Sequence, residues 1–471
     1  MKNLISTVAL FFVSCMVMAA QGAMIDSLVL IPEGSFSMGS TVKEKWGEDD
    51  EIAHMVKVGS FYCDPYEVRQ SDFEKIMGKN PSHFKGGNLP VENVTWFDAI
   101  EYCNRLSESK NLTSVYTVSG DTKTGKATVT WNRAANGYRL LTEAEWEYAC
   151  RAGAQTRYSF GNQVNANLAN FEGSYPYSIE DNYVHRTDST VKESRVRWTT
   201  IAVDSLPPNK FGLYNMHGNV SEWCFDYYAP YDTKDDDNPA GGKAGHLRVN
   251  RGGAYNDFGK HLRSCYRSAT NPIDIDQNLG FRICRNAENA SSRGSQKTVA
   301  EFVTTYDLSI SIPKSPKILV AYYSYSGNTE RGAQLIAEMT GGDLFKIEMQ
   351  QPYSGGIYEA SQKDLGAYYK TPLKSHVKNF AQYDIILLGY PTWWATLPMP
   401  IVTFLEEYDF SGKTVINFSS HGGTMFGDSV SALSKKISKS YIGVGYEWEY
   451  SRHRREDISE WLKQNGVPMK N

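Results

Sequence analysis

Five apolar runs alternate with amphipathic helices in the last third of the chain, and this alternation constrains the fold more than any other feature. Each run is apolar on both faces, so each strand is expected to be covered on both sides. Such strands, joined by helices, predict a doubly wound α/β domain with a parallel sheet. The expected strands span 317–324, 343–349, 384–389, 414–418 and 442–449, and the expected helices span 329–339, 400–408, 429–437 and 455–464.

The region before this domain follows a different pattern. It is rich in Gly, Asn and aromatic residues and has few long helical patterns. One helix is expected over 96–107 with Thr95 as its N-cap, and a second begins at the capping box Thr142–Glu145. The remainder predicts short strands and long ordered loops, which make an irregular α+β domain.

Length and cysteine usage divide the chain in the same place. At 471 residues the chain is too long for one ordinary core. Six cysteines lie between Cys63 and Cys284, and none follows. We therefore expect a first domain over 24–286, a linker over 287–315 and a second domain over 316–468. Within the linker, residues 302–312 are apolar enough to pack as a strand.

The N-terminus has the features of a secretory signal. Lys2 precedes an apolar run from Leu4 to Ala20, and small residues follow, which predicts a signal peptide over residues 1–22. A membrane anchor would need a slightly longer run, and lipoprotein cleavage before Cys15 ranks below simple secretion. The sequence thus predicts an exported protein of the periplasm or cell envelope, not transmembrane after cleavage.

Composition excludes two classes of protein. Basic and acidic residues nearly balance, 49 against 53, so no bulk positive field recruits a nucleic acid. Hydrophobic residues make up 41%, which is too few for a polytopic membrane protein. The chain is expected to be globular and not to bind nucleic acid.

Six ordered motifs in the first region resemble the formylglycine-generating enzyme (sulfatase-modifying factor) family. The resemblance implies a fold related to C-type lectins. The motifs are LIPEGSFSMG at 30–39, PVENVTW at 90–96, YRLLTEAEWEYA at 138–149, GLYNMHGNVSEW at 212–223, RGG at 251–253 and NLGFR at 278–282.

The catalytic copper site of that family is missing here. The oxygen-dependent members hold soft Cu(I) with a cysteine pair shortly after the Arg-Gly-Gly motif, whereas residues 254–262 contain no cysteine. Ala254 replaces a serine of those enzymes, and Ser221 replaces an active-site tryptophan. We therefore expect no formylglycine synthesis, and a first domain that binds a protein or peptide ligand instead.

A Ca²⁺ site is one of two interpretations of the loop Asn215 to Glu222. In the family this loop holds Ca²⁺ through side-chain and main-chain oxygens, and Asn215, Gly218, Val220 and Glu222 match its positions. In the other interpretation Asn215 and Glu222 only stabilise the turn. His217 between them is expected to be a surface or hydrogen-bonded histidine and not a ligand.

Secreted relatives in this family also imply a disulfide pattern. By matching positions, Cys103 would pair with Cys284 and Cys150 with Cys265. Both bridges would close loops of more than 100 residues, each contributing roughly 2–4 kcal/mol. Cys63 and Cys224 then remain as a third bridge or as two buried thiols, of which the buried thiols are the expected state.

Three polar or aromatic loops follow strands of the second region. They are 324–329 (SYSGNT), 391–394 (PTWW) and 419–423 (SSHGG). Because the carboxyl ends of parallel strands meet at one sheet edge, the three loops are expected to converge there. Taken singly, the first loop could be a hydroxyl-rich N-cap turn, and the tryptophans could pack against the other domain.

Together these loops resemble the short single-domain branch of the flavodoxin family, over residues 317–465. The resemblance implies FMN: the first loop would hold its phosphate, and the other two would border the ring. The implied FMN-binding residues are Ser324, Ser326, Gly327, Asn328, Thr329, Pro391, Thr392, Trp393, Trp394, Ser419, Ser420, His421, Gly422 and Gly423.

The two resemblances predict an exported FMN-binding redox protein that acts in electron transfer or FMN-dependent reduction, with a redox partner that the sequence does not name. The alternative is a non-catalytic structural or recognition protein of the cell envelope. An atypical sulfatase-modifying factor ranks third.

Overall fold

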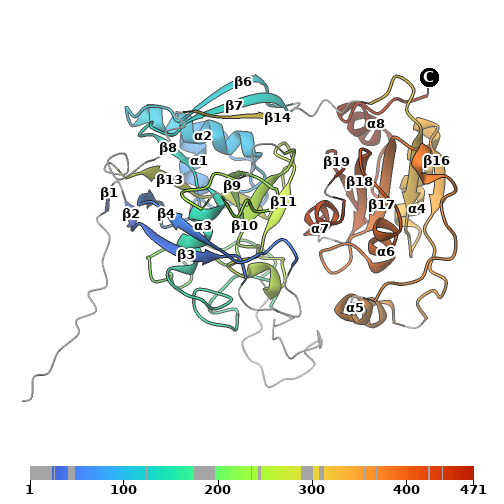
Figure 1. The fold of residues 1–471 in the computed structure, drawn as a ribbon, viewed down its shortest axis with the longest axis horizontal. Coiled ribbons are helices and arrows are strands. Elements are labelled where there is room, and N and C mark those ends of the chain that lie inside the picture. Colours follow the sequence, from blue (N-terminus) through green and yellow to red (C-terminus); the bar gives the residue numbers. More distant parts are fainter. Residues whose placement is uncertain are drawn as a thin grey trace, which may run out of the picture.

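The computed structural model places two domains side by side (Figure 1). It describes residues 24–25, 27–40, 48–123, 125–173, 197–234, 236–241, 245–287, 301–306, 312–354, 356–367, 369–422, 425–437 and 439–470. The expected signal peptide over 1–22, with Cys15, lies outside these residues. None of the described helices is long and apolar enough to cross a membrane.

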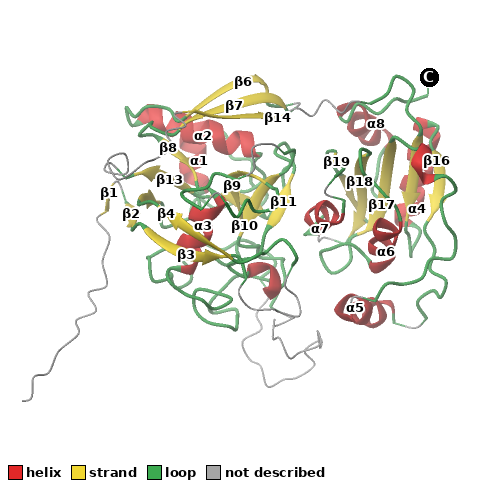
Figure 2. Cartoon of the chain, viewed as in Figure 1, coloured by secondary structure: helices red, strands yellow, loops and turns green. Residues whose placement is uncertain are grey.

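The first domain is built from small sheets, short helices and long loops (Figure 2). Its largest described sheet has the order β1-β2-β5-β13-β8, and a second has the order β11-β10-β9-β12. β3 pairs with β4, and β6 with β7. The strands are β1 Met24–Ile25, β2 Leu28–Ile31, β3 Gly34–Met38, β4 His54–Val58, β5 Phe61–Cys63, β6 Tyr116–Asp121, β7 Lys126–Asn132, β8 Tyr138–Leu140, β9 Ser221–Tyr227, β10 Arg248–Arg251, β11 Ser268–Thr270, β12 Leu279–Phe281 and β13 Ile283–Asn286. The helices are α1 Gln70–Met77, α2 Trp96–Ser109, α3 Glu143–Arg151 and the 3-10 helix η1 Gly259–Leu262.

Both predicted helix starts of this domain are confirmed. Thr95 caps α2 and Thr142 caps α3, each in a full capping box that satisfies free backbone amides. Each helix buries an aromatic face: Trp96 of α2 and Trp146 of α3 are almost completely enclosed. The irregular α+β fold class is therefore the observed one.

The expected linker contains a strand that belongs to the first domain. β14, Glu301–Tyr306, pairs antiparallel with β7 along its whole length. This segment is shorter than the predicted piece at 302–312, and residues 288–300 and 307–311 lie outside the described part. Part of the segment between the domains is thus paired backbone.

The second domain is the predicted parallel sheet covered by helices. Its order is β16-β15-β17-β18-β19, with β20 also on β18, and every pairing is parallel. The strands are β15 Ile318–Tyr322, β16 Asp343–Lys346, β17 Ile385–Pro391, β18 Thr414–His421, β19 Tyr441–Ile442 and β20 Tyr446–Glu449. The helices are α4 Asn328–Thr340, α5 Ile357–Ala367, α6 Met399–Glu407, α7 Ser429–Lys436, α8 Arg455–Gln464 and the 3-10 helix η3 Phe380–Gln382.

Two details of this domain differ from the prediction. α5 was not expected, because 357–367 has a weak apolar stripe. The fifth predicted strand is split into β19 and β20, with Gly443 and Gly445 between them. At both glycines an added Cβ would press on a neighbouring side chain, 2.5 Å from Asn465 Oδ1 and 2.6 Å from Phe426.

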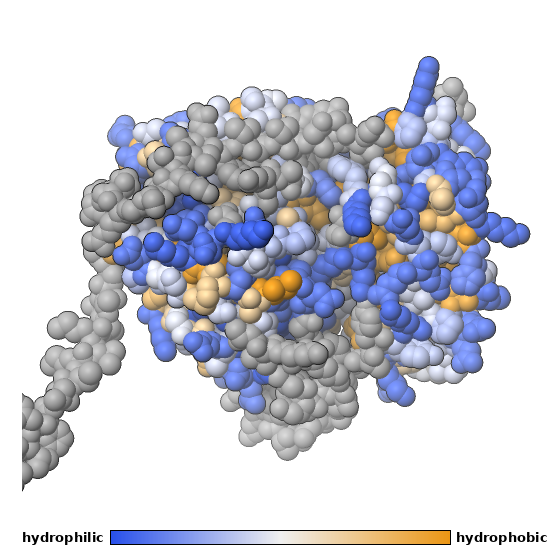
Figure 3. All heavy atoms as spheres, in the orientation of Figure 1, coloured by the Kyte–Doolittle hydropathy of each residue, from blue (hydrophilic) through white to orange (hydrophobic). Residues whose placement is uncertain are grey.

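The two domains touch along α7, β19 and β11. Leu247 and Ala269 of the first domain belong to the same buried cluster as Leu433 of α7. Ser268 donates a hydrogen bond to Asp428 (3.3 Å), and the Ile442 amide donates to Nε2 of His246 (3.2 Å). Apolar side chains gather along this seam (Figure 3). The first domain therefore has a packed partner within its own chain.

The predicted disulfides are absent from the structure, in which all six described cysteines are free and buried. Cys150 faces Ser264 at 3.7 Å, while Cys265 turns to Arg263 and Glu51. Ser264, and not the neighbouring Cys265, is therefore the residue that faces Cys150.

The other predicted bridge fails for a related reason. Cys284 lies directly across from Cys63 in the β5–β13 pair, and its thiol donates to the Leu140 carbonyl at 3.5 Å. The prediction that Cys63 and Cys224 are buried thiols is confirmed.

Candidate functional site

Three loops meet at the carboxyl edge of the second domain's sheet, as the parallel order requires. Thr329, at the start of α4, lies 2.8 Å from Ser420 near the end of β18, hydroxyl to hydroxyl. Thr392, after β17, bonds in the same way to Ser419 at 2.6 Å. These four hydroxyl groups are buried. Their hydrogen bonds join the three loops to one another, and they therefore fix the relative positions of the loops.

The first loop presents its polar groups outward. Gly327 has φ +83°, a left-handed conformation that glycine adopts without strain, and its amide donates to Ser324 Oγ at 3.1 Å. This turn leads directly into α4, whose first amides have no helical partner. Ser326 is exposed, and Ser324 and Asn328 are half-buried. The loop can therefore offer hydroxyls and amides to an anion.

One basic residue beside this loop was not singled out from the sequence. Arg331 lies one helical turn into α4 and donates to Asn328 Oδ1 at 2.5 Å. A Cβ added at Gly327 would lie 3.7 Å from its guanidinium. Its position in the sequence SGNTER, four residues after Gly327, could have predicted that it lies beside this loop. Arg331 adds a positive charge at the mouth of the loop.

Trp393 borders the same edge within a cage of tyrosines. Its ring centroid lies 5.6 Å from that of Tyr323 and 6.1 Å from those of Tyr325 and Tyr353. All three tyrosines belong to the second domain. These aromatic contacts of Trp393 therefore lie within its own domain, and not against the first domain as the alternative expected. Trp393 is half-buried, which leaves part of its ring for a ligand.

Trp394 is held in a tight turn. It has φ +55°, and Ala395 after it has φ +52°. Its indole Nε1 donates to Ser361 of α5 at 3.1 Å. The unexpected helix α5 therefore supports the second loop.

The third loop ends beside an exposed aromatic residue that the sequence analysis missed. The amide of Tyr450 donates to the His421 carbonyl at 2.8 Å, and a Cβ added at Gly422 would lie 3.4 Å from the Tyr450 hydroxyl. Tyr450 and Tyr325 are each about half exposed, at 54% and 52%. Burial lowers the pKa of His421, so its ring is neutral at pH 7. Gly423 lies outside the described residues.

In the first domain, the backbone conformation explains why Asn and Gly occur in the loop that was predicted to bind Ca²⁺. Asn215, Gly218 and Asn219 all have left-handed φ values, +50°, +86° and +70°. Asn and Gly are the residues that tolerate this conformation. The Asn215 and Asn219 side chains both donate to Glu67, at 2.9 and 3.0 Å.

Glu222, the carboxylate of the proposed Ca²⁺ set, is already neutralised. It is buried against Arg282, with the shortest contact at 2.7 Å, and accepts from Trp146 Nε1 at 2.8 Å. The set therefore offers no free carboxylate, whereas the side-chain oxygen of Asn215 is buried without a hydrogen-bond partner. The contacts favour the turn-stabilising interpretation, and Ca²⁺ binding here stays a prediction.

His217 is a buried hydrogen-bonded histidine. Its Nδ1 lies 2.7 Å from the Leu262 carbonyl, and its Nε2 accepts from the Ser159 amide at 3.0 Å. Nε2 also lies 3.6 Å from Cys150 Sγ. Burial lowers the pKa of His217 to about 4 and raises that of Cys150 to about 12. The pair is neutral and enclosed, which makes it a packing contact and not a nucleophile.

A buried network of ion pairs was not foreseen from the sequence. Arg267 binds Glu143 in a two-pronged pair at 2.7 and 2.8 Å, and Arg251 pairs with Glu147 of the same helix. The motif residues Glu143 and Glu147 of α3 and Arg251 of the Arg-Gly-Gly motif are thus structural here. Two further buried pairs are Arg263–Glu51 and Arg139–Glu145.

Comparison with known proteins identifies both parts of the chain. Residues 15–287, more than half of the chain, match the family model of the sulfatase-modifying factor enzyme 1-like domain, and residues 317–465 match that of flavodoxin. Chaperone protein LppX of Paenibacillus barcinonensis is 32% identical over 282 residues, covering 55% of this chain and 90% of that protein. The formylglycine-generating enzyme of Mus musculus is 29% identical over 323 residues, covering 55% and 74%.

A solved structure resembles the second domain. It is a putative flavoprotein from Bacteroides eggerthii, 32% identical, covering 33% of this chain and 100% of that chain with a TM-score of 0.31. The chain therefore belongs to the family of proteins with a sulfatase-modifying factor enzyme 1-like domain, to which a flavodoxin-like domain is joined.

Proposed function

We propose that this chain is an exported flavoprotein that binds FMN in its second domain and uses it in electron transfer or FMN-dependent reduction. The observation that carries the proposal is the meeting of three loops at one sheet edge, tied by the Thr329–Ser420 and Thr392–Ser419 bonds. The match of residues 317–465 to the flavodoxin family model supports it.

The described residues suit the parts of FMN. Ser324, Ser326 and the amides at Gly327 and Asn328 would hold the phosphate, with Arg331 adding a charge. Trp393 would border the ring, and the exposed side chains of Tyr325 and Tyr450 would cover it. FMN supplies the redox chemistry when bound, while the protein orients it and excludes water.

FMN binding is tested by titrating residues 24–471 with FMN and following flavin fluorescence. We expect quenching by the nearby Trp393 ring. Trp393→Ala is expected to weaken binding by about tenfold or more, because stacking of a flat ring on an aromatic side chain is worth about 1–3 kcal/mol. The matched control is Trp198→Ala, an exposed tryptophan of the first domain (58%), which should leave the affinity unchanged. Absence of FMN binding to the wild-type chain at micromolar FMN would refute the proposal.

The first domain is proposed to bind a ligand and not to make formylglycine. No cysteine lies in 254–262, so the thiolate pair that would hold Cu(I) is missing. Incubation with copper, oxygen and a Cys-x-Pro-x-Arg peptide should leave the peptide mass unchanged, with a copper-dependent member of the family as positive control. Appearance of the aldehyde product would show that another group replaces the cysteine pair.

A non-catalytic recognition role in the cell envelope is the second candidate. It is favoured by the relative named as a chaperone, which matches the first domain over 90% of its own length. Protein purified from its native compartment decides between the two, since flavin absorbance supports the first and a colourless protein the second. N-terminal sequencing of the same sample tests whether residues 1–22 are removed on export.

A further inference from the structure

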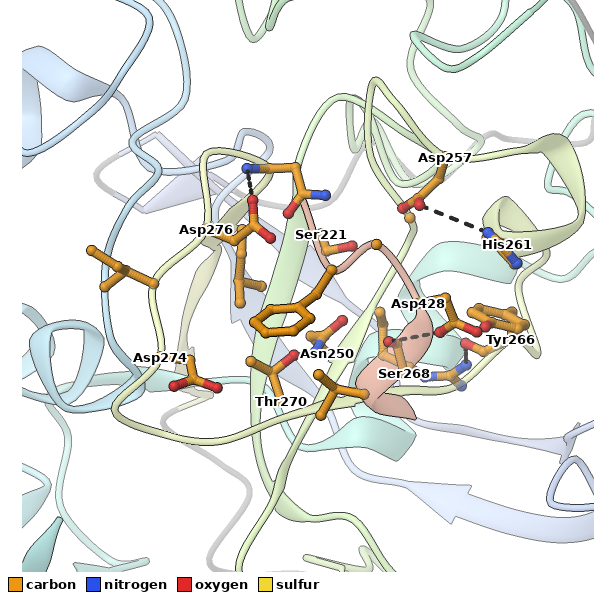
Figure 4. Close-up of a pocket in the computed structure, with 18 residues that line it drawn as sticks. Ser221, Asn250, Asp257, His261, Tyr266, Ser268, Thr270, Asp274, Asp276 and Asp428 are labelled. Atoms are coloured by element: carbon orange, nitrogen blue, oxygen red, sulfur yellow. Dashed lines mark hydrogen bonds and ion pairs between the residues drawn. The ribbon is translucent and has the colours of Figure 1, made fainter. Parts of the chain in front are cut away.

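A pocket lies at the seam between the two domains, where α7 begins. Residues of both domains line it: Asn250, Thr270 and Asp276 come from the first, and Phe426 and Asp428 from the second (Figure 4). Its volume is about 50 Å³. A single water needs only about 10–15 Å³ on this measure, so the pocket can take a small polar head group.

The charge of the lining is strongly unbalanced. Four aspartates face one arginine, and that arginine, Arg251, is already paired with Glu147 and lies 3.3 Å from Glu143. The pocket therefore favours a cationic ligand over an anion. The four aspartates are Asp257, Asp274, Asp276 and Asp428.

A buried histidine in the wall lacks hydrogen-bond partners. His261 is 1% exposed, and neither ring nitrogen makes a hydrogen bond; the closest charged atom is Asp257 Oδ1 at 3.7 Å. Burial lowers its pKa to about 3, so the ring is neutral and one nitrogen is a free acceptor. Buried polar atoms are normally satisfied. An N–H donor in the pocket would supply the missing partner.

The aspartates carry a burial cost that a cation would offset. Burial raises the pKa of Asp257 to about 6, that of Asp276 to about 7 and that of Asp274 to about 8, and it also raises the pKa of Asp428, so a bound cation would favour the ionised carboxylates. Lys260 and Lys435 already offset part of this cost at Asp257 and Asp428.

The rest of the lining suits an alkyl chain. Ile275, which is 56% exposed, lines the pocket together with Leu279 and the Phe426 side chain. An aromatic face also attracts a nearby ammonium. A metal ion is disfavoured, because no three His, Cys, Asp or Glu side chains in the described residues are arranged to hold one.

We propose that this interdomain pocket binds a primary ammonium group, with the alkyl chain that carries it leaving past Ile275. Of the three N–H groups of the ammonium, one donates to the free nitrogen of His261 and the others donate to aspartate carboxylates of the pocket. Its source is either a free alkylamine or the lysine side chain of a peptide, since both present the same group.

Calorimetric titration of residues 24–471 without FMN tests this. n-Butylamine is compared with 1-butanol, and Nα-acetyl-lysine amide with Nα-acetyl-norleucine amide, which has the chain without the charge. We expect each amine to bind at least about tenfold more tightly than its neutral counterpart, as a hydrogen-bonded charge provides. Tighter binding of the lysine amide than of butylamine assigns the source to a peptide, and the reverse to a free amine.

Two variants locate the site. Asp276→Asn and Asp428→Asn are each expected to weaken amine binding about tenfold. Asp409→Asn, on a fully exposed loop, is the matched control and should have no effect. Equal binding of amines and neutral counterparts to the wild-type chain overturns the proposal, whether or not the variants fold. Unchanged amine affinity in both folded variants also overturns it.

Discussion

Replacing Arg282 by methionine is expected to lower the free energy of unfolding of the first domain by about 3–5 kcal/mol. Arg282 is 1% exposed and binds Glu222 with its Nε and Nη2 atoms. It also donates to the carbonyls of Asp64 and Tyr214. Removing the guanidinium leaves the buried Glu222 carboxylate with the Trp146 indole as a donor, and it takes one donor from each of the carbonyls of Asp64 and Tyr214.

The measurement is urea denaturation, followed by hydrogen exchange so that peptides of β9 and β12 report on the first domain alone. Arg105→Met is the matched control, since Arg105 pairs with Glu101 on the surface of the first domain with 48% and 50% of the two side chains exposed. Such pairs contribute about 0–1 kcal/mol. Adding Glu222→Gln to Arg282→Met should recover part of the loss. A loss for Arg282→Met as small as that of the surface control would contradict the assignment of a buried ion pair.

The second domain could be predicted from sequence almost in full because its signals are local. Buried strands such as Ile385–Pro391 are continuous apolar runs, and parallel pairing sends their ends to one edge. The convergence of the three loops follows from that rule alone. α5 was missed because its apolar pattern is weak, and with it the Trp394–Ser361 contact that supports the second loop.

In the first domain, the contacts between residues far apart in the sequence could not be predicted. Its motifs could be recognised, but the sequence does not say that Arg251 reaches Glu147, 104 residues away. Such pairs depend on which loops meet, and a charged residue in a motif looks the same whether it binds a ligand or a partner. The sequence also does not show which of two neighbouring turn residues faces a partner: Ser264, and not Cys265, meets Cys150.

The contact between the two domains could also not be predicted from the sequence. His246 and Asp428 lie on loops without a distinguishing pattern, and each is polar and solvated by default. In the structure the Ile442 amide donates to His246, and Asp428 accepts from Ser268. Residues of both domains line the interdomain pocket, so the pattern of neither domain alone predicts it.

Replacing Gly218 by alanine is expected to lower the free energy of unfolding by more than about 3 kcal/mol, because two costs combine at this position. Its φ of +86° strains any L side chain by about 1–2 kcal/mol. An added Cβ would also lie 2.2 Å from the Asn170 carbonyl oxygen, which accepts from the Asn219 amide and has little freedom to move. Gly212→Ala is the matched control: its φ is +82°, but no atom lies within 4 Å of the added Cβ, so only the backbone strain remains. Thermal unfolding of the two variants should therefore separate clearly, with Gly218→Ala the less stable. Equal stability would mean that the loop relaxes away from Asn170, and that the glycine of the Asn-x-x-Gly-Asn motif serves something other than this close backbone approach.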